Sequence, residues 1–139
     1  MSVDAAARIE IHELLARSAH ALDQRDLASL EACFAPDATL VIVIAGGAGP
    51  LRFEGRDKIM GLMRDSIATQ TDQRRHVTTN TMVVAESGAE VSLVSNLTLT
   101  AVEQGAIRLV TSGLYRDRVR RGASGWVLAE RRIDLDMPY

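Results

Sequence analysis

The second half of the chain consists of four consecutive segments with strand character, and this pattern limits the fold more than any other feature. Residues 75–85, 90–102, 106–118 and 125–134 are rich in Val, Thr, Leu and Ile. The short sequences ESG, EQG and RGAS separate them, and each suits a hairpin turn. Four strands joined by hairpins predict an antiparallel meander and argue against a βαβ fold.

The first half of the chain has the periodicity of helices. Within residues 5–22, apolar side chains recur at the 3.6-residue spacing of one helix face. A shorter helix is expected after Asp26, with Phe34 on its buried face, and a turn at Pro36 is expected to end it.

A strand over residues 39–45 and a third helix that includes residues 59–67 complete the pattern. Helices that precede most of the strands predict an α+β fold, in which three N-terminal helices pack on a mostly antiparallel sheet. The 139 residues fit one domain, residues 1–139, with no linker or repeat. A chain of this length buries roughly two-thirds of its unfolded surface and needs no disulfide or metal to fold.

Composition argues against several classes of partner. The net charge of −2 is unlike the basic excess of a nucleic-acid-binding protein. The single cysteine, Cys33, rules out an internal disulfide and suits a reducing compartment. The longest apolar run, residues 40–45, is far shorter than the roughly 20 residues of a membrane span, and the N-terminus has no signal-peptide pattern. We therefore expect a cytoplasmic protein without a membrane or nucleic-acid partner.

The sequence also lacks the common patterns of metal and phosphate sites. His12 and His20 are eight residues apart, about 80° from each other around a helix, and no HExxH or HxH motif occurs. The glycine-rich residues 46–49 are not followed by the Lys-Ser/Thr pair and helix of a phosphate-binding loop. We predict neither a metal nor a cofactor.

Short motifs along the chain resemble the SnoaL-like branch of the nuclear transport factor 2-like superfamily. They include IHELLAR (11–17), FAPDA (34–38), FEGR (53–56), RHVTTN (75–80), GLYRD (113–117) and WVLAERR (126–132), in order over nearly the whole length. The resemblance implies a curved sheet wrapped against three helices, a cone that encloses an apolar pocket. Dehydratases, isomerases, polyketide cyclases and the small subunits of ring-hydroxylating dioxygenases share this fold, so the fold alone does not fix the function.

His76 is the first candidate catalytic residue. Histidine suits proton transfer because its unperturbed pKa, about 6.5, is close to neutral pH. Strand alternation places His76, Thr78 and Asn80 on one face, which groups a base with two hydrogen-bonding side chains. In the resembled dehydratases, a histidine in this motif faces the pocket and acts as the general base. The alternative is a strand-edge histidine that only makes structural hydrogen bonds.

Asp23 is the second candidate catalytic residue. The resembled enzymes carry an aspartate at this position of the first helix, functionally paired with the strand histidine. A carboxylate so placed orients the imidazole and stabilises its charged form. The alternatives are a solvated carboxylate or a cap for the second helix, shared with Asp26.

Other candidates would bind the substrate. Relatives of the dehydratase type commonly carry a tyrosine where this chain has Ser18, and that tyrosine hydrogen-bonds the substrate carbonyl. In this chain the role of the tyrosine is either lost or passes to Tyr115, Thr78 or a water molecule. Asn80 either polarises a substrate oxygen or satisfies backbone groups at a sheet bend. Arg132 either binds an anionic group or forms a surface ion pair, the commoner use of exposed arginines.

These residues predict a small cofactor-free lyase or isomerase (a dehydratase, isomerase or cyclase) that acts on a hydrophobic, carbonyl-bearing small molecule. The alternatives are a non-catalytic small subunit of the dioxygenase type and a ligand-binding protein of the same fold. The strand at residues 90–102 carries apolar residues on both faces, with Val94 opposite Leu93 and Leu97. This suggests burial on both sides, and we expect a homodimer or homotrimer formed through the sheet.

Overall fold

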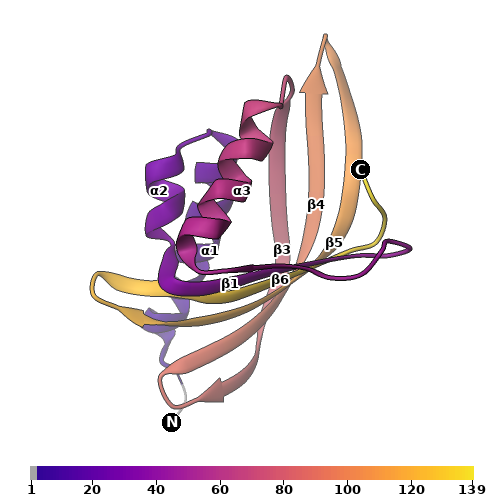
Figure 1. Cartoon of the computed structure of the whole chain (residues 1–139). Coiled ribbons are helices and arrows are strands. Elements are labelled where there is room, and N and C mark those ends of the chain that lie inside the picture. The colour runs from indigo at the N-terminus through magenta and orange to yellow at the C-terminus, as the bar shows by residue number, and fades with distance from the viewer. Residues whose placement is uncertain (1–2) are drawn as a thin grey trace.

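The computed structural model describes residues 3–139, which form a layer of three helices and one six-stranded sheet (Figure 1). The helices are α1 (Ala5–Asp23), α2 (Leu27–Ala32) and α3 (Arg56–Ala68). The strands are β1 (Phe34–Ile44), β2 (Leu51–Glu54), β3 (Gln73–Ser87), β4 (Glu90–Glu103), β5 (Ala106–Gly122) and β6 (Gly125–Leu135). No helix within residues 3–139 has the length and apolar character needed to cross a bilayer.

The sheet has the strand order β2-β1-β6-β5-β4-β3. β3 to β6 form the antiparallel meander that the sequence predicts, and β2 pairs antiparallel with β1. β1 pairs in parallel with β6, and this pairing attaches the strands of the first half of the chain to the meander of the second half. The predicted α+β fold, with three helices on a curved and mostly antiparallel sheet, is confirmed (Figure 1).

The main core lies between the helix layer and the inner face of the sheet. α1 begins at its cap Asp4, whose carboxylate accepts from the Ala7 amide at 2.8 Å, and it buries Ile11 and Leu14. These side chains pack with Leu30, Phe34, Leu40, Ile59, Leu93, Val119 and Leu128. Toward the other end of the sheet, a smaller buried cluster contains Leu97, Tyr115 and Leu135.

The predicted end of the second helix is wrong. α2 stops at Ala32, and Phe34 is not a helical residue but the first residue of β1, opposite Leu128 in the parallel ladder. Pro36 lies inside β1, where the pairing register shifts between Phe34 and Thr39. A proline is tolerated there because no regular ladder bond needs its missing N–H.

Among the irregularities of the sheet, two change which of the candidate site residues face its inside. In β3 the register shifts between Thr79 and Met82, and Asn80 takes a left-handed φ of 56°. Between β5 and β6, Arg118 pairs with Glu130 while Val119 pairs with Leu128, which leaves Ala129 as an extra residue. Beyond each irregularity, the alternation between inner and outer face is reversed.

Candidate active site

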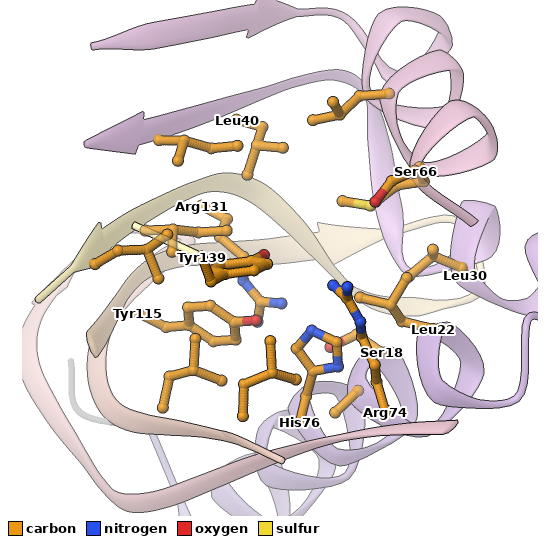
Figure 2. Close-up of a pocket in the computed structure, with 18 of the residues that line it drawn as sticks. Ser18, Leu22, Leu30, Leu40, Ser66, Arg74, His76, Tyr115, Arg131 and Tyr139 are labelled. Atoms are coloured by element: carbon orange, nitrogen blue, oxygen red, sulfur yellow. The ribbon is translucent and has the colours of Figure 1, made fainter. Parts of the chain in front are cut away.

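A cavity of about 170 Å³ opens between the helix layer and the inner face of the sheet (Figure 2). Most of its wall is aliphatic and includes Leu22, Leu40, Leu62, Leu97, Leu99 and Leu135. A cavity of roughly 150 Å³ can hold a benzene ring. The volume therefore fits a small molecule built around a single ring.

A few polar side chains interrupt this apolar wall. They are Ser18, Ser66, Gln70, Arg74, His76, Tyr115, Arg131 and Tyr139. No aspartate or glutamate of residues 3–139 is among the lining side chains. An apolar pocket with a few convergent polar groups is the usual form of a small-molecule site.

His76 enters the cavity from β3 and is held from behind by Asp23. The Nδ1 atom of His76 lies 2.6 Å from Oδ1 of Asp23. The backbone N–H of His76 also donates to both carboxylate oxygens, at 3.1 and 3.0 Å. Both side chains are largely buried, with 12% of His76 and 7% of Asp23 exposed. One carboxylate therefore fixes the ring and its backbone together.

The position of Asp23 follows from the end of the first helix. Asp23 is the last residue of α1, Gln24 caps the helix, and Arg25 turns the chain with a φ of 59°. A carboxylate at a helix C-terminus is unfavourable beside the negative end of the helix dipole. The hydrogen bonds from His76 offset this cost. Asp26 alone caps α2, through the Ser29 amide at 3.1 Å, so the alternative of a cap shared with Asp23 is wrong.

The contact with Asp23 determines which nitrogen of His76 is free. An ionised carboxylate only accepts hydrogen bonds, so Nδ1 carries the hydrogen in the neutral ring. Nε2 then has an unshared electron pair. This is the arrangement of a general base oriented by a carboxylate.

Tyr115 and Arg131 lie across the cavity from His76, and Figure 2 shows the hydroxyl, the guanidinium and the imidazole directed toward the same space. The Arg131 guanidinium stacks 4.1 Å from the Tyr115 ring centre and makes two hydrogen bonds to Asp117, at 2.8 and 2.9 Å. Burial raises the pKa of Tyr115 to about 12. The phenol therefore keeps its proton at neutral pH and is a hydrogen-bond donor.

Ser18 also lines the cavity, but its hydroxyl donates to the Leu15 carbonyl in its own helix at 2.7 Å. Its proton is thus engaged, while its oxygen can still accept. Tyr115, one of the residues predicted to replace the missing tyrosine, brings a hydroxyl to the cavity from the sheet side instead.

Three predicted substrate-binding residues lie outside this cavity. Thr78 is on the inner face of β3 but lies against α1, in a surface groove with His12 and Ala16. Asn80 is exposed, so its predicted place on the face of His76 is wrong, because the irregularity in β3 turns it outward. Arg132 is exposed and pairs with Asp134 at 3.0 Å, which matches the alternative of a surface ion pair.

Two arginines of the cavity were missed by the sequence analysis. Counting alternate positions from Trp126 assigns Arg132 to the buried face of β6, but the extra residue at Ala129 gives that place to Arg131. Arg74 precedes His76 by two residues, so strand alternation was the signal that would have placed it in the cavity.

Within residues 3–139, no group of three or more His, Cys, Asp or Glu side chains is arranged to hold a metal ion.

Comparison with known proteins agrees with this fold. A family model for the SnoaL-like domain matches residues 3–132. No functionally curated protein matches the chain at a significant level.

Solved structures resemble the chain over nearly its full length. A protein of unknown function with a cystatin-like fold from Nostoc punctiforme is 26% identical, with a TM-score of 0.81, over 99% of this chain and 98% of that one. Aln2 from a Streptomyces species is 23% identical, with a TM-score of 0.82, over 97% and 94%. A chain assigned as the beta subunit of an aromatic-ring-hydroxylating dioxygenase from Novosphingobium aromaticivorans is 16% identical, with a TM-score of 0.82, over 96% and 92%. The last two likenesses concern the fold alone.

Proposed function

This chain belongs to the SnoaL-like domain family, and we propose that it is a small lyase or isomerase that removes a proton next to a carbonyl group. The observation that carries the proposal is the contact of 2.6 Å between Nδ1 of His76 and the Asp23 carboxylate at the wall of an apolar cavity. A merely structural histidine at a strand edge would not need a free ring nitrogen beside such a cavity.

The proposed reaction begins with transfer of a proton from the carbon next to the carbonyl to Nε2 of His76. Asp23 keeps the ring in position and stabilises the imidazolium that forms. The electron pair of the broken C–H bond moves to the carbonyl oxygen. The Tyr115 hydroxyl and the N–H groups of Arg131 that Asp117 leaves free would donate to this oxyanion.

The second half of the reaction depends on the substrate. If a hydroxyl or similar group sits on the next carbon, the electron pair returns, that group leaves and His76 gives it the proton, which is an elimination. If a carbon–carbon double bond stands there instead, the electron pair of the enolate extends over that bond, and His76 returns the proton to its far carbon, which is an isomerisation that moves the double bond into conjugation with the carbonyl. Both outcomes use the same residues.

The proton-removal step can be tested before the natural substrate is known. The protein is incubated in D₂O with a panel of small cyclic ketones, and loss of the proton signal next to the carbonyl is followed by NMR. We expect exchange that falls by roughly 10²–10⁴ in His76→Ala, the usual contribution of a positioned general base. Asp23→Asn should also fall strongly, since its amide can donate to Nδ1 and favour the wrong tautomer.

Matched controls separate catalysis from general damage. His20→Ala removes an exposed histidine of α1, and Asp26→Asn keeps the α2 cap, because asparagine caps as well as aspartate. Both should exchange at the wild-type rate. Exchange by His76→Ala within a few-fold of wild type would reject the proposal.

A further inference from the structure

Arg74 extends into the cavity from the same face of β3 as His76 (Figure 2). Residues two apart on a strand have Cα atoms about 7 Å apart. One small molecule can therefore touch both side chains at once. The Arg74 side chain is 19% exposed, so it lies at the partly desolvated edge of the cavity and not in bulk water.

The guanidinium of Arg74 is incompletely paired. Its Nε donates to Oδ1 of Asp72 at 3.0 Å, while the other carboxylate oxygen accepts from Arg108 at 3.1 Å. Arg25 donates to the backbone carbonyl of the same Asp72 at 2.6 Å. Among residues 3–139, Asp72 is the only carboxylate that forms an ion pair with any of these three arginines. The cluster therefore carries an excess of positive charge.

The second arginine of the cavity does not share this excess. Arg131 is matched by Asp117, which binds it through both carboxylate oxygens. No aspartate or glutamate side chain of residues 3–139 lines the cavity to neutralise Arg74. The Tyr139 ring lies 5.5 Å from the Arg74 guanidinium carbon and covers it on one side. No group of residues 3–139 accepts a hydrogen bond from the two terminal nitrogens of Arg74, so these nitrogens remain for a ligand.

We propose that Arg74 binds a carboxylate carried by the ligand, so that the substrates are compact, largely apolar acids that also contain a carbonyl group. This rests on the proposed function, because the carboxylate at Arg74 would place the reacting carbon at His76. A guanidinium fits a carboxylate through two parallel hydrogen bonds, which fixes orientation as well as charge. Arg74 is thus a residue that determines specificity, while His76 performs the chemistry.

Calorimetric binding of two matched probes tests this assignment. The probes are 3-phenylpropanoate and its neutral amide, titrated into the full chain at neutral pH. Wild type should bind the acid roughly tenfold more tightly than the amide, the scale of one charge-assisted pair. Arg74→Gln should lose this preference and bind the amide as before. Arg108→Gln is the matched control, because it removes a partner of the same Asp72 that does not line the cavity, and it should keep the preference.

Each other outcome decides the question. Equal binding of the two probes by wild type, no binding of the acid at millimolar concentration, or an unchanged preference in Arg74→Gln would overturn the proposal. If Arg74→Gln binds neither probe, Arg74→Lys decides, since a retained preference supports the charge assignment and its loss contradicts it. His76→Ala should keep the acid preference while proton exchange is lost, so failure of the binding proposal and failure of the proposed reaction are distinguishable.

Discussion

At the residue scale, the cavity brings together groups that differ in how completely their charge is compensated. Asp23 and His76 hold each other, and Asp117 and Arg131 form a bidentate pair with side chains 1% and 7% exposed. The Tyr115 hydroxyl makes no hydrogen bond to any side chain or backbone group of residues 3–139, although Arg131 stacks on the ring. Its hydroxyl is consequently available to a bound molecule and not committed to holding the fold.

The buried phenol of Tyr115 predicts a loss of stability in alkali. Burial raises its pKa to about 12, whereas a tyrosine in the unfolded chain ionises near 10. Between about pH 10 and 12 the unfolded state releases this proton while the folded state retains it. The free energy of unfolding should therefore fall as pH rises through this window, by at most about 1.4 kcal/mol per pH unit from this group.

Urea unfolding at about pH 7, 10 and 11 checks this expectation. Tyr115→Phe should lose less stability than wild type over the alkaline interval, whereas Tyr139→Phe, which removes an exposed hydroxyl, should behave as wild type. Burial also raises the pKa of Cys33, with the same sign, and the comparison between variants cancels that contribution. Identical slopes for wild type and Tyr115→Phe would contradict the assignment.

At the element scale, the left-handed backbone of one residue in β3 predicts that glycine is tolerated there better than a branched side chain. Asn80 has a φ of 56°, a conformation open to glycine and asparagine but strained for a branched side chain. Asn80→Val should lower the free energy of unfolding by roughly 1–3 kcal/mol, while Asn80→Gly should change it little. The midpoints of urea unfolding give the comparison.

The same substitutions address the proposed chemistry. Since Asn80 lies outside the cavity, Asn80→Gly should exchange ketone protons at the wild-type rate. A large loss of exchange in a variant that remains folded would contradict this and would support Asn80 as a hydrogen-bond donor to the oxyanion.

Much of the fold could be predicted from the sequence because period and turns are local properties. The helical stripe of α1 and the ESG, EQG and RGAS turns of the meander mark their elements without help from the rest of the chain. The pairing of His76 with Asp23 was also predicted, although through the family resemblance and not from spacing. The sequence alone could not predict which side chains of a strand face inward beyond an irregularity in the pairing. The extra residue at Ala129 depends on pairing with β5, and it alone decides whether Arg131 or Arg132 faces the cavity.

At the scale of the whole molecule, all three helices lie on one side of the sheet, and no other part of residues 3–139 covers the opposite side (Figure 1). On that side, β4 presents mainly Ser, Thr and Asn between its buried residues, with Val94 half-buried. Val77, Met82 and Val84 of β3 are 42%, 59% and 58% exposed. Further exposed apolar side chains come from the β4–β5 hairpin, where Val102, Ile107 and Leu109 are 44%, 74% and 69% exposed. Neighbouring apolar side chains on an open sheet face are typical of an association surface.

We propose that the chain forms a homodimer or homotrimer through this outer face. Size-exclusion chromatography with light scattering should show a self-associated species at micromolar concentration. The double variant Met82→Glu, Val84→Glu should shift it to the monomer, and Ile9→Glu, on the exposed side of α1, should not. A wild-type monomer, or association only with a different and larger subunit, would contradict the proposal.

Asp23 contacts both the ring and the backbone N–H of His76, and this has a consequence for engineering the protein. β3 is an edge strand of the sheet, and the unpaired amides of an edge strand can bind strands of other molecules. Asp23 occupies one of those amides with the same carboxylate that orients the ring. Changing Asp23 would thus expose this backbone amide and also free the His76 ring, so we expect solubility to fall together with the proposed activity. A search for new reactions in this scaffold should keep Asp23 and diversify the aliphatic wall instead.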